Sequence, residues 1–142
     1  MSMINRRFRL FDHTADLGVE FFGPTREELY VCAALAVVAL ITHADCVSPD
    51  QEKHFSVEGA DETDLFVNFL REVLYLINGE RFLPKTVAIN ACDAYRLTAI
   101  LHGEHINTQK HLINKEIKAV TYHKAAVEKT EQGWKGRIIF DV

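Results

Sequence analysis

Apolar positions recur along the chain with two different periods, one typical of strands and one typical of helices. Residues 8–11 and 17–22 are short apolar-rich segments, and side chains alternate in the second, so two strands joined by a polar turn are predicted. Thr25 and Glu28 have the spacing of a capping box. The apolar run that follows is long enough for a central, buried helix that ends near Thr42.

A second helix is predicted after Asp61, where apolar side chains recur at helical spacing. Asp61 is a suitable N-cap residue, and Asn78 with Gly79 marks the expected end of the helix. The recurring apolar positions are Phe66, Phe69, Leu70, Val73 and Ile77. Because these positions share one face of a helix, we expect that face to pack and the opposite face to be exposed.

Period-two patterns predict the remaining strands. They cover residues 53–58, 87–91, 95–101, 116–128 and 134–142. A tight turn at Asp93 is expected to join the second and third of these strands as a hairpin, and residues 131–133 to link the last two. Strands and helices do not alternate regularly, and short turns favour antiparallel pairing. The sequence therefore predicts an α+β fold with a mostly antiparallel sheet and two main helices, in one domain over residues 1–142.

Composition narrows the class of protein. A chain of 142 residues with 48% hydrophobic side chains can bury a sizeable core without metal or disulfide staples. Its three cysteines are far apart and form no C-x-x-C motif, which favours a reducing cytoplasmic location. The start of the chain lacks the apolar region of a secretory signal, and the longest apolar run, residues 29–41, is too short to span a membrane. The net charge of −4 opposes strong direct binding to nucleic acid.

Several common catalytic motifs are missing from the sequence. There is no Gly-rich phosphate-binding loop, no H-E-x-x-H and no G-x-S-x-G, so the sequence does not support self-contained nucleotide or acyl chemistry. His102 and His105 would share a face on a helix and could hold a metal there. They lie at a predicted strand end, however, and two partly exposed histidines with no common ligand are the favoured interpretation.

Acidic residues gather at two places that the fold could bring together. Asp12 and Asp16 flank the polar turn before the second strand, and Asp141 lies beside Val142, whose α-carboxylate is ionised if the chain ends there. If the first and last strands approach each other, these carboxylates would suit Mg²⁺, Mn²⁺ or Ca²⁺ rather than zinc. The alternative is a set of solvated carboxylates. His13 could orient the turn by hydrogen bonding.

Lys118 admits two interpretations. An exposed strand lysine commonly pairs with an acidic neighbour across the sheet and contributes little to function. A functional lysine would instead present a point charge to a phosphate.

Several separated motifs stand out along the chain. Three are DHTAD at residues 12–16, EIKAVTYH at residues 116–123 and the ending FDV at residues 140–142. Others are TREEL at residues 25–29, FLREVL at residues 69–74, and Gly103-Glu104 followed by Lys110-His111. Together these motifs resemble the archease family, the small accessory proteins of RtcB-type RNA ligases. The resemblance covers nearly the whole chain and is loosest over residues 44–53 and 82–93.

The resemblance implies an α+β protein that is not itself an enzyme. Such a protein promotes guanylylation of a GTP-dependent RNA ligase and lets it turn over repeatedly, in tRNA splicing or RNA repair. The family's metal site falls on Asp16, Asp141 and Val142 here, and its important lysine falls on Lys118. Two other classes remain open: a chaperone-like binding module, and a self-sufficient metal-dependent hydrolase that uses Asp12, Asp16 and Asp141.

Overall fold

Within the part of the chain that the structure describes, two α-helices and seven strands confirm the α+β class. The computed structural model describes residues 8–11 and 16–142. The elements are β1 Phe8–Phe11, β2 Leu17–Gly23, α1 Arg26–Ile41, the 3-10 turn η2 Ala44–Cys46, β3 Gln51–Glu58, α2 Glu62–Asn78, β4 Phe82–Asn90, β5 Arg96–His105, β6 Ala119–Thr130 and β7 Gly133–Asp141.

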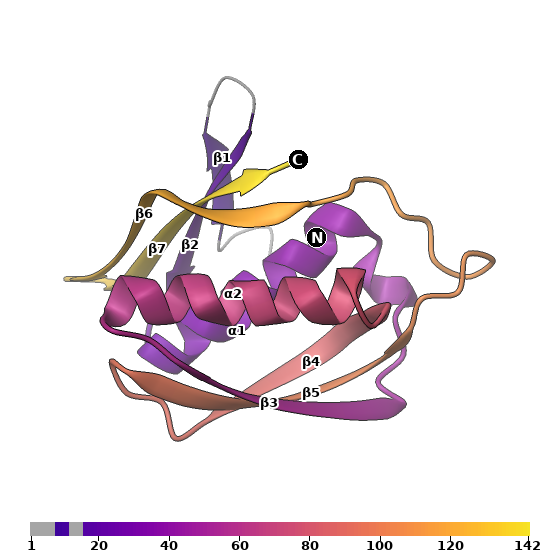
Figure 1. Ribbon diagram of the computed structural model, residues 1–142, viewed down its shortest axis with the longest axis horizontal. Helices are drawn as coiled ribbons and strands as arrows, with labels where there is room; N and C mark the ends of the chain where they lie inside the picture. The colour runs from indigo at the N-terminus through magenta and orange to yellow at the C-terminus, as the bar shows by residue number, and fades with distance from the viewer. Residues whose placement is uncertain (1–7, 12–15) are drawn as a thin grey trace.

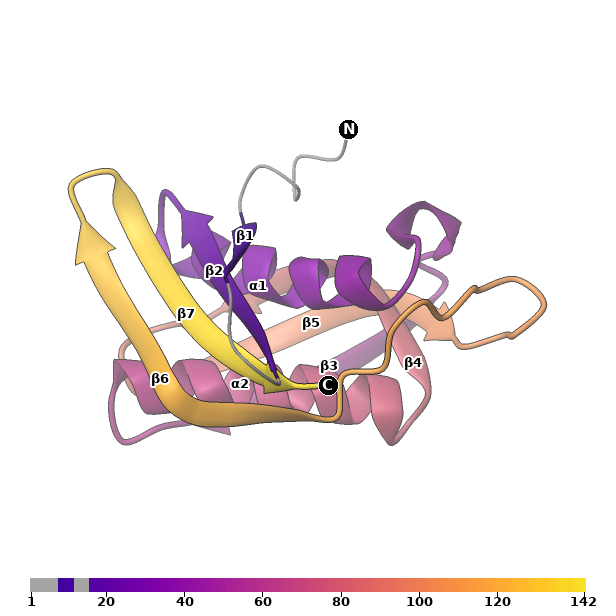
Figure 2. The same cartoon turned by 90° about the horizontal axis from the view of Figure 1, so that it is seen from above.

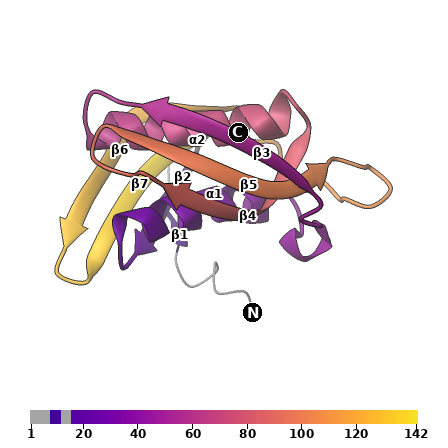
Figure 3. The ribbon, with the colours of Figure 1, turned by 90° about the horizontal axis from the view of Figure 1, so that it is seen from below.

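The strands form two antiparallel sheets with the two helices between them (Figure 1). The first sheet has the order β1-β2-β7-β6; it lies above the helices in Figure 1 and in front of them in Figure 2. The second sheet has the order β3-β5-β4 and covers their other side, as seen from below in Figure 3. Both helices pack against strands of both sheets, which makes a three-layer arrangement.

The position of each helix explains its sequence pattern. Helix α1 contacts β2 on one side and β4 on the other, and its apolar residues are buried around most of its circumference. Helix α2 keeps one exposed side, which includes Arg71 and Tyr75. The predicted N-caps are confirmed, because the Glu28 amide donates to the Thr25 hydroxyl at 3.1 Å and the Asp64 amide donates to the Asp61 carboxylate at 2.8 Å.

Aromatic side chains join the layers in the core. The ring of Tyr30 on α1 meets the rings of Phe66 and Phe69 on α2 edge-on, with centroids 5.2 and 5.0 Å apart. Phe66 in turn meets Phe21 of β2 at 5.9 Å. Such edge-to-face pairs add to the stabilisation from burial alone. The first sheet and both helices therefore share one continuous core.

The structure confirms the hairpin turn at Asp93, whose carboxylate accepts hydrogen bonds from the amides of Tyr95 and Arg96 at 2.8 and 3.0 Å. It corrects the start of the strand expected at residue 116, because β6 begins at Ala119. The backbone just before β6 is held by a side chain instead, since the Ile117 carbonyl accepts a hydrogen bond from the Asn78 amide group.

No helix within residues 8–11 and 16–142 is long and apolar enough to cross a membrane.

Candidate functional site

The pairing of β2 with β7 brings Asp16 and Asp141 together. Leu17 lies opposite Phe140 in this antiparallel pair, and one further step of the same register places Asp16 opposite Asp141. Directly opposed residues project from the same face of a sheet, and successive residues alternate between faces. Phe140 faces the buried core. Asp141 therefore projects from the outer face, away from the helices, and Asp16, which immediately precedes β2, would share that face if the extended register continues to it.

The end of the chain and Lys118 lie at the same corner of the first sheet. The Lys118 amide donates a hydrogen bond to the Asp141 carbonyl at 2.8 Å, and Ala119 is opposite Asp141 in the β6–β7 pair. Figure 2 shows the chain end beside the segment that enters β6. The four residues to which the resemblance gives a role, Asp16, Lys118, Asp141 and Val142, thus come from three separated segments and meet at one place.

Lys118 nevertheless lies on the other side of the sheet from Asp141. Val120 is opposite Phe140 and is buried, and Lys118 precedes it by two residues. Lys118 lines a surface hollow with Arg71 and Tyr75 of α2, so it lies on the α2 side of the sheet. In the described ranges no ion pair or hydrogen bond involves the Lys118 ammonium group, so the expected acidic partner across the sheet is not seen.

The donor set at this corner fits a hard divalent cation. Asp16 and Asp141 offer two carboxylates, and the Val142 carboxylate would add a third if the chain ends there. Within residues 8–11 and 16–142, no three His, Cys, Asp or Glu side chains gather in a way that could hold a metal, so the described side chains alone form no three-ligand site. The ligand set stays a prediction. Asp12 and His13, the alternative candidates, lie outside the described residues.

The favoured interpretation of His102 and His105 is confirmed, because they do not form a shared site. Both belong to β5, where residues three apart point to opposite faces. The His102 Nε2 atom lies 3.1 Å from a Glu52 carboxylate oxygen, while the His105 ring packs edge-on against Phe82.

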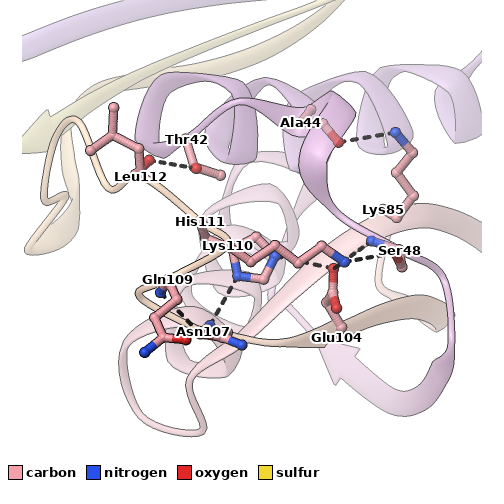
Figure 4. A network of polar contacts seen from close by, with 10 residues as sticks. All are labelled: Thr42, Ala44, Ser48, Lys85, Glu104, Asn107, Gln109, Lys110, His111 and Leu112. Carbon is pink, nitrogen blue, oxygen red and sulfur yellow. Dashed lines mark hydrogen bonds and ion pairs between the residues drawn. The ribbon is translucent and has the colours of Figure 1, made fainter.

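A partly buried carboxylate holds the long loop between β5 and β6, residues 106–118, which we call the connecting loop. The Glu104 Oε2 atom accepts hydrogen bonds from the Ser48 amide at 2.7 Å and from His111 Nε2 at 3.0 Å, and it pairs with Lys110 Nζ at 2.7 Å (Figure 4). Chiefly through Lys110, these donors lower the pKa of Glu104 to about 2. The Asn107 backbone amide donates to His111 Nδ1 at 2.9 Å. In a neutral His111 the ring proton is therefore on Nε2.

Further contacts fix the connecting loop along its length. The Thr42 hydroxyl donates to the Leu112 carbonyl at 2.6 Å, and the Asn114 amide donates to the Ile41 carbonyl at 2.8 Å. The Asn78 amide group donates to the Ile117 carbonyl at 2.8 Å. The connecting loop that ends at Lys118 is therefore anchored at several points. Glu104 and His111 entered the prediction only as part of the resemblance, and their pairing across the loop was not predicted.

Comparison with known proteins gives a consistent result. The profile of the Archease protein family (MTH1598/TM1083) matches residues 8–142. Protein archease of Pyrococcus abyssi is 33% identical over 141 residues, covering 96% of this chain and 99% of that protein. Protein archease of Methanosarcina barkeri is 31% identical, with full coverage of both chains.

Solved structures share the fold. The solution structure of Methanobacterium thermoautotrophicum protein 1598 matches with a TM-score of 0.80 at 27% identity, covering 96% of this chain and 99% of that one. A crystal structure from Thermotoga maritima, described as an archease and possible chaperone, matches with a TM-score of 0.62 at 23% identity, covering 93% and 94%.

Proposed function

This chain belongs to the archease family, and we propose that it is a metal-binding accessory protein that activates an RtcB-type RNA ligase. It promotes transfer of GMP to the ligase and allows repeated turnover, and it neither seals RNA nor hydrolyses GTP alone. The observation that carries the proposal is the meeting of Asp16, Asp141, Val142 and Lys118, whose motifs suggested this role, at one corner of the first sheet. Whether the ligase serves tRNA splicing or RNA repair follows from the source organism.

A divalent cation, Ca²⁺, Mg²⁺ or Mn²⁺, would be held by the Asp16 and Asp141 carboxylates with the Val142 carboxylate as the third donor. The cation, when bound, neutralises these negative charges and can attract a phosphate of the partner complex. Asp141 projects from the outer face of the sheet, so a cation there can be reached by a partner. The β2–β7 pairing fixes the strand ends that carry the two carboxylates, which would hold them near each other before any metal arrives.

Lys118 contributes a separate positive charge on the α2 side of the same corner. Its backbone is fixed by the Asp141 carbonyl, and its ammonium group is exposed. A lysine so placed can contact a phosphate or a carboxylate of the ligase without any change in the fold. Its role is to bind and orient the partner; among the described residues the hollows that it lines offer one carboxylate, Glu116, and no His, Cys, Ser or Thr side chain.

A chaperone-like binding module is the second candidate. The Thermotoga maritima protein of the same fold is described as a possible chaperone. Large apolar side chains are exposed in this chain, among them Tyr75 and Leu112, which are 58% and 64% exposed. This class of function predicts activity that does not depend on metal. The third class, a self-sufficient hydrolase, has no support from an identifiable general base.

One set of assays separates the three classes. The purified chain is mixed with Mn²⁺ or Mg²⁺ and GTP, with and without an RtcB-type ligase from the same organism, and ligated RNA and released phosphate are measured. We expect ligation to rise only when chain, ligase and metal are all present. Phosphate release by the chain alone would indicate a hydrolase. Equal stimulation by wild-type chain and by the Asp16→Asn and Asp141→Asn variants would favour the chaperone-like class, because its activity does not depend on metal held by the chain.

A further inference from the structure

We propose that a cationic groove beside Lys118 binds an acidic, partly apolar segment of the partner protein. This inference rests on the proposed function, because it names how the ligase is held. The groove consists of two neighbouring hollows, of about 490 and 330 Å³, which share Asn78 and Lys118 as common walls. Arg71 and Tyr75 line the first hollow, on α2. Arg81 and Lys115 line the second, which lies against the connecting loop.

A hydrogen bond stabilises the boundary between the two hollows. The Asn78 amide group donates to the Ile117 carbonyl at 2.8 Å, and the Ile117 side chain is fully buried. Helix α2 and the connecting loop are therefore tied together where the hollows meet. A site that is already formed before binding loses less conformational entropy when a partner is bound.

The groove concentrates positive charge on a chain whose net charge is −4. Arg71, Arg81, Lys115 and Lys118 line it, and Glu116 is the one carboxylate in its lining. Over the part of the chain that the structure describes, no ion pair or hydrogen bond occupies the side chains of Arg81, Lys115 or Lys118. Their charges are thus available to carboxylates on another molecule, and complementary charges increase the rate and the specificity of association.

Some basic side chains outside the groove are neutralised by carboxylates of the same chain. Arg26 pairs with Glu62 at 2.8 Å, and Lys53 pairs with Glu80 at 2.9 Å.

Arg71 makes no ion pair among the described residues: its guanidinium donates to the Val120 carbonyl at 3.4 Å and stacks on the Tyr122 ring at 4.7 Å from the ring centroid. The Asp64 carboxylate, which is bonded to the Tyr122 hydroxyl, offsets part of its charge at longer range. Stacking orients the guanidinium group, and its remaining N–H groups can bind an anion.

Apolar side chains at the rim favour a protein segment over RNA. Tyr75 is 58% exposed beside the first hollow, and Ile113, in the lining of the second, is 37% exposed. Single-stranded RNA is usually bound by several aromatic rings that stack on successive bases, whereas aliphatic side chains suit the side chains of a peptide. The net negative charge of the chain also opposes a polyanion. An acidic segment with an aliphatic or aromatic anchor fits both features.

Charge reversal in the groove tests the inference. Binding of the full chain to an RtcB-type ligase from the same organism is measured by titration calorimetry at low and high salt, for wild type, Arg71→Glu and Arg81→Glu. Each reversal should raise the Kd roughly tenfold or more at low salt and less at high salt. Arg71→Gln and Arg81→Gln should give intermediate values. The matched control is Lys129→Glu, an exposed lysine on β6 outside the groove lining, which should change the Kd less than about twofold.

Zero-length cross-linking identifies the partner segment directly. A carbodiimide joins lysine amines to carboxylates that touch them, so Lys115 and Lys118 should cross-link to one acidic segment of the ligase, read out by mass spectrometry. Circular dichroism and melting curves show whether each variant is folded. A single-stranded RNA oligonucleotide is titrated in parallel. RNA binding that is lost in Arg71→Glu and Arg81→Glu, with ligase affinity unchanged, would overturn the inference in favour of an RNA site.

The proposed function and the groove can fail separately. If the wild-type chain neither binds nor stimulates the ligase, both the proposed function and the identity of the groove's partner are wrong. If the wild-type chain stimulates the ligase but the folded charge-reversal variants bind it as tightly as wild type does, only the proposal for the groove is wrong.

Discussion

Replacing Glu104 tests whether this carboxylate fixes the connecting loop. Glu104→Gln keeps the shape of the side chain and an acceptor oxygen for the Ser48 and His111 donors, but removes the charge that faces Lys110. Glu104→Ala removes the acceptor altogether. The two variants therefore separate the contribution of the charge from that of the hydrogen bonds.

The structure sets the expected magnitudes. A drop in the Glu104 pKa from 4.5 to about 2 corresponds to at most about 3 kcal/mol of stability. Solvent screening reduces this value, because the Lys110 side chain is 41% exposed while Glu104 is 16% exposed. We expect Glu104→Gln to lose about 1–2 kcal/mol at neutral pH. Glu104→Ala leaves the donors of Ser48 and buried His111 without an acceptor, so it should lose roughly 2–5 kcal/mol.

Urea unfolding followed by circular dichroism, repeated between pH 2 and pH 7, measures both effects. Glu104 is more acidic in the folded chain, so the unfolded chain takes up this proton first as the pH falls. Its stabilisation is complete above about pH 4.5 and is lost as the pH falls toward 2. The difference between wild type and Glu104→Gln should therefore shrink across that range.

The same variants should affect function in the same order. A loosened connecting loop holds the segment that leads to Lys118 less firmly. Stimulation of the ligase should therefore fall in Glu104→Ala more than in Glu104→Gln. Equal stability of wild type and Glu104→Gln at pH 7, together with a difference that does not change between pH 4.5 and pH 2, would refute the role given to this carboxylate.

Three further predictions concern the corner of the first sheet. Lys118→Ala should keep the melting temperature within roughly a few degrees, as a surface change does, while ligase stimulation falls sharply; unchanged stimulation would remove Lys118 from the account. Ca²⁺ or Mn²⁺ should raise the melting temperature of wild type by mass action, and Asp16→Asn and Asp141→Asn should abolish that rise without lowering metal-free stability; undiminished metal affinity by calorimetry in both variants would place the ligands elsewhere. A short extension after Val142 should weaken metal binding, because a peptide carbonyl replaces the carboxylate, and equal affinity would show that this carboxylate is no ligand.

Local signals predicted the elements well, because each depends on residues near in sequence. Thr25 and Asp61 cap the helices as their spacing predicted, and Asp93 makes the hairpin turn. The apolar run after Thr25 predicted a buried helix, and the two sheets that cover α1 explain why so few of its positions are polar.

The features that the sequence did not predict depend on contacts between segments that are far apart in the chain. The expected strand at residue 116 begins instead at Ala119, since the Asn78 side chain takes the Ile117 carbonyl. The side of the sheet on which Lys118 lies depends on the β6–β7 register, which periodicity within one strand does not reveal. Arg71 and Tyr75 were detectable only as polar and aromatic positions four apart on the exposed side of α2.

The most direct test of the central claim is the rate of GMP transfer to the ligase in the presence of GTP and Mn²⁺. The ligase is incubated alone, with wild-type chain, and with the Asp141→Asn variant, and covalently bound GMP is followed with time. We expect wild-type chain to accelerate GMP transfer to the ligase clearly, and the folded Asp141→Asn variant to accelerate it little or not at all. The same rate with and without wild-type chain would contradict this expectation.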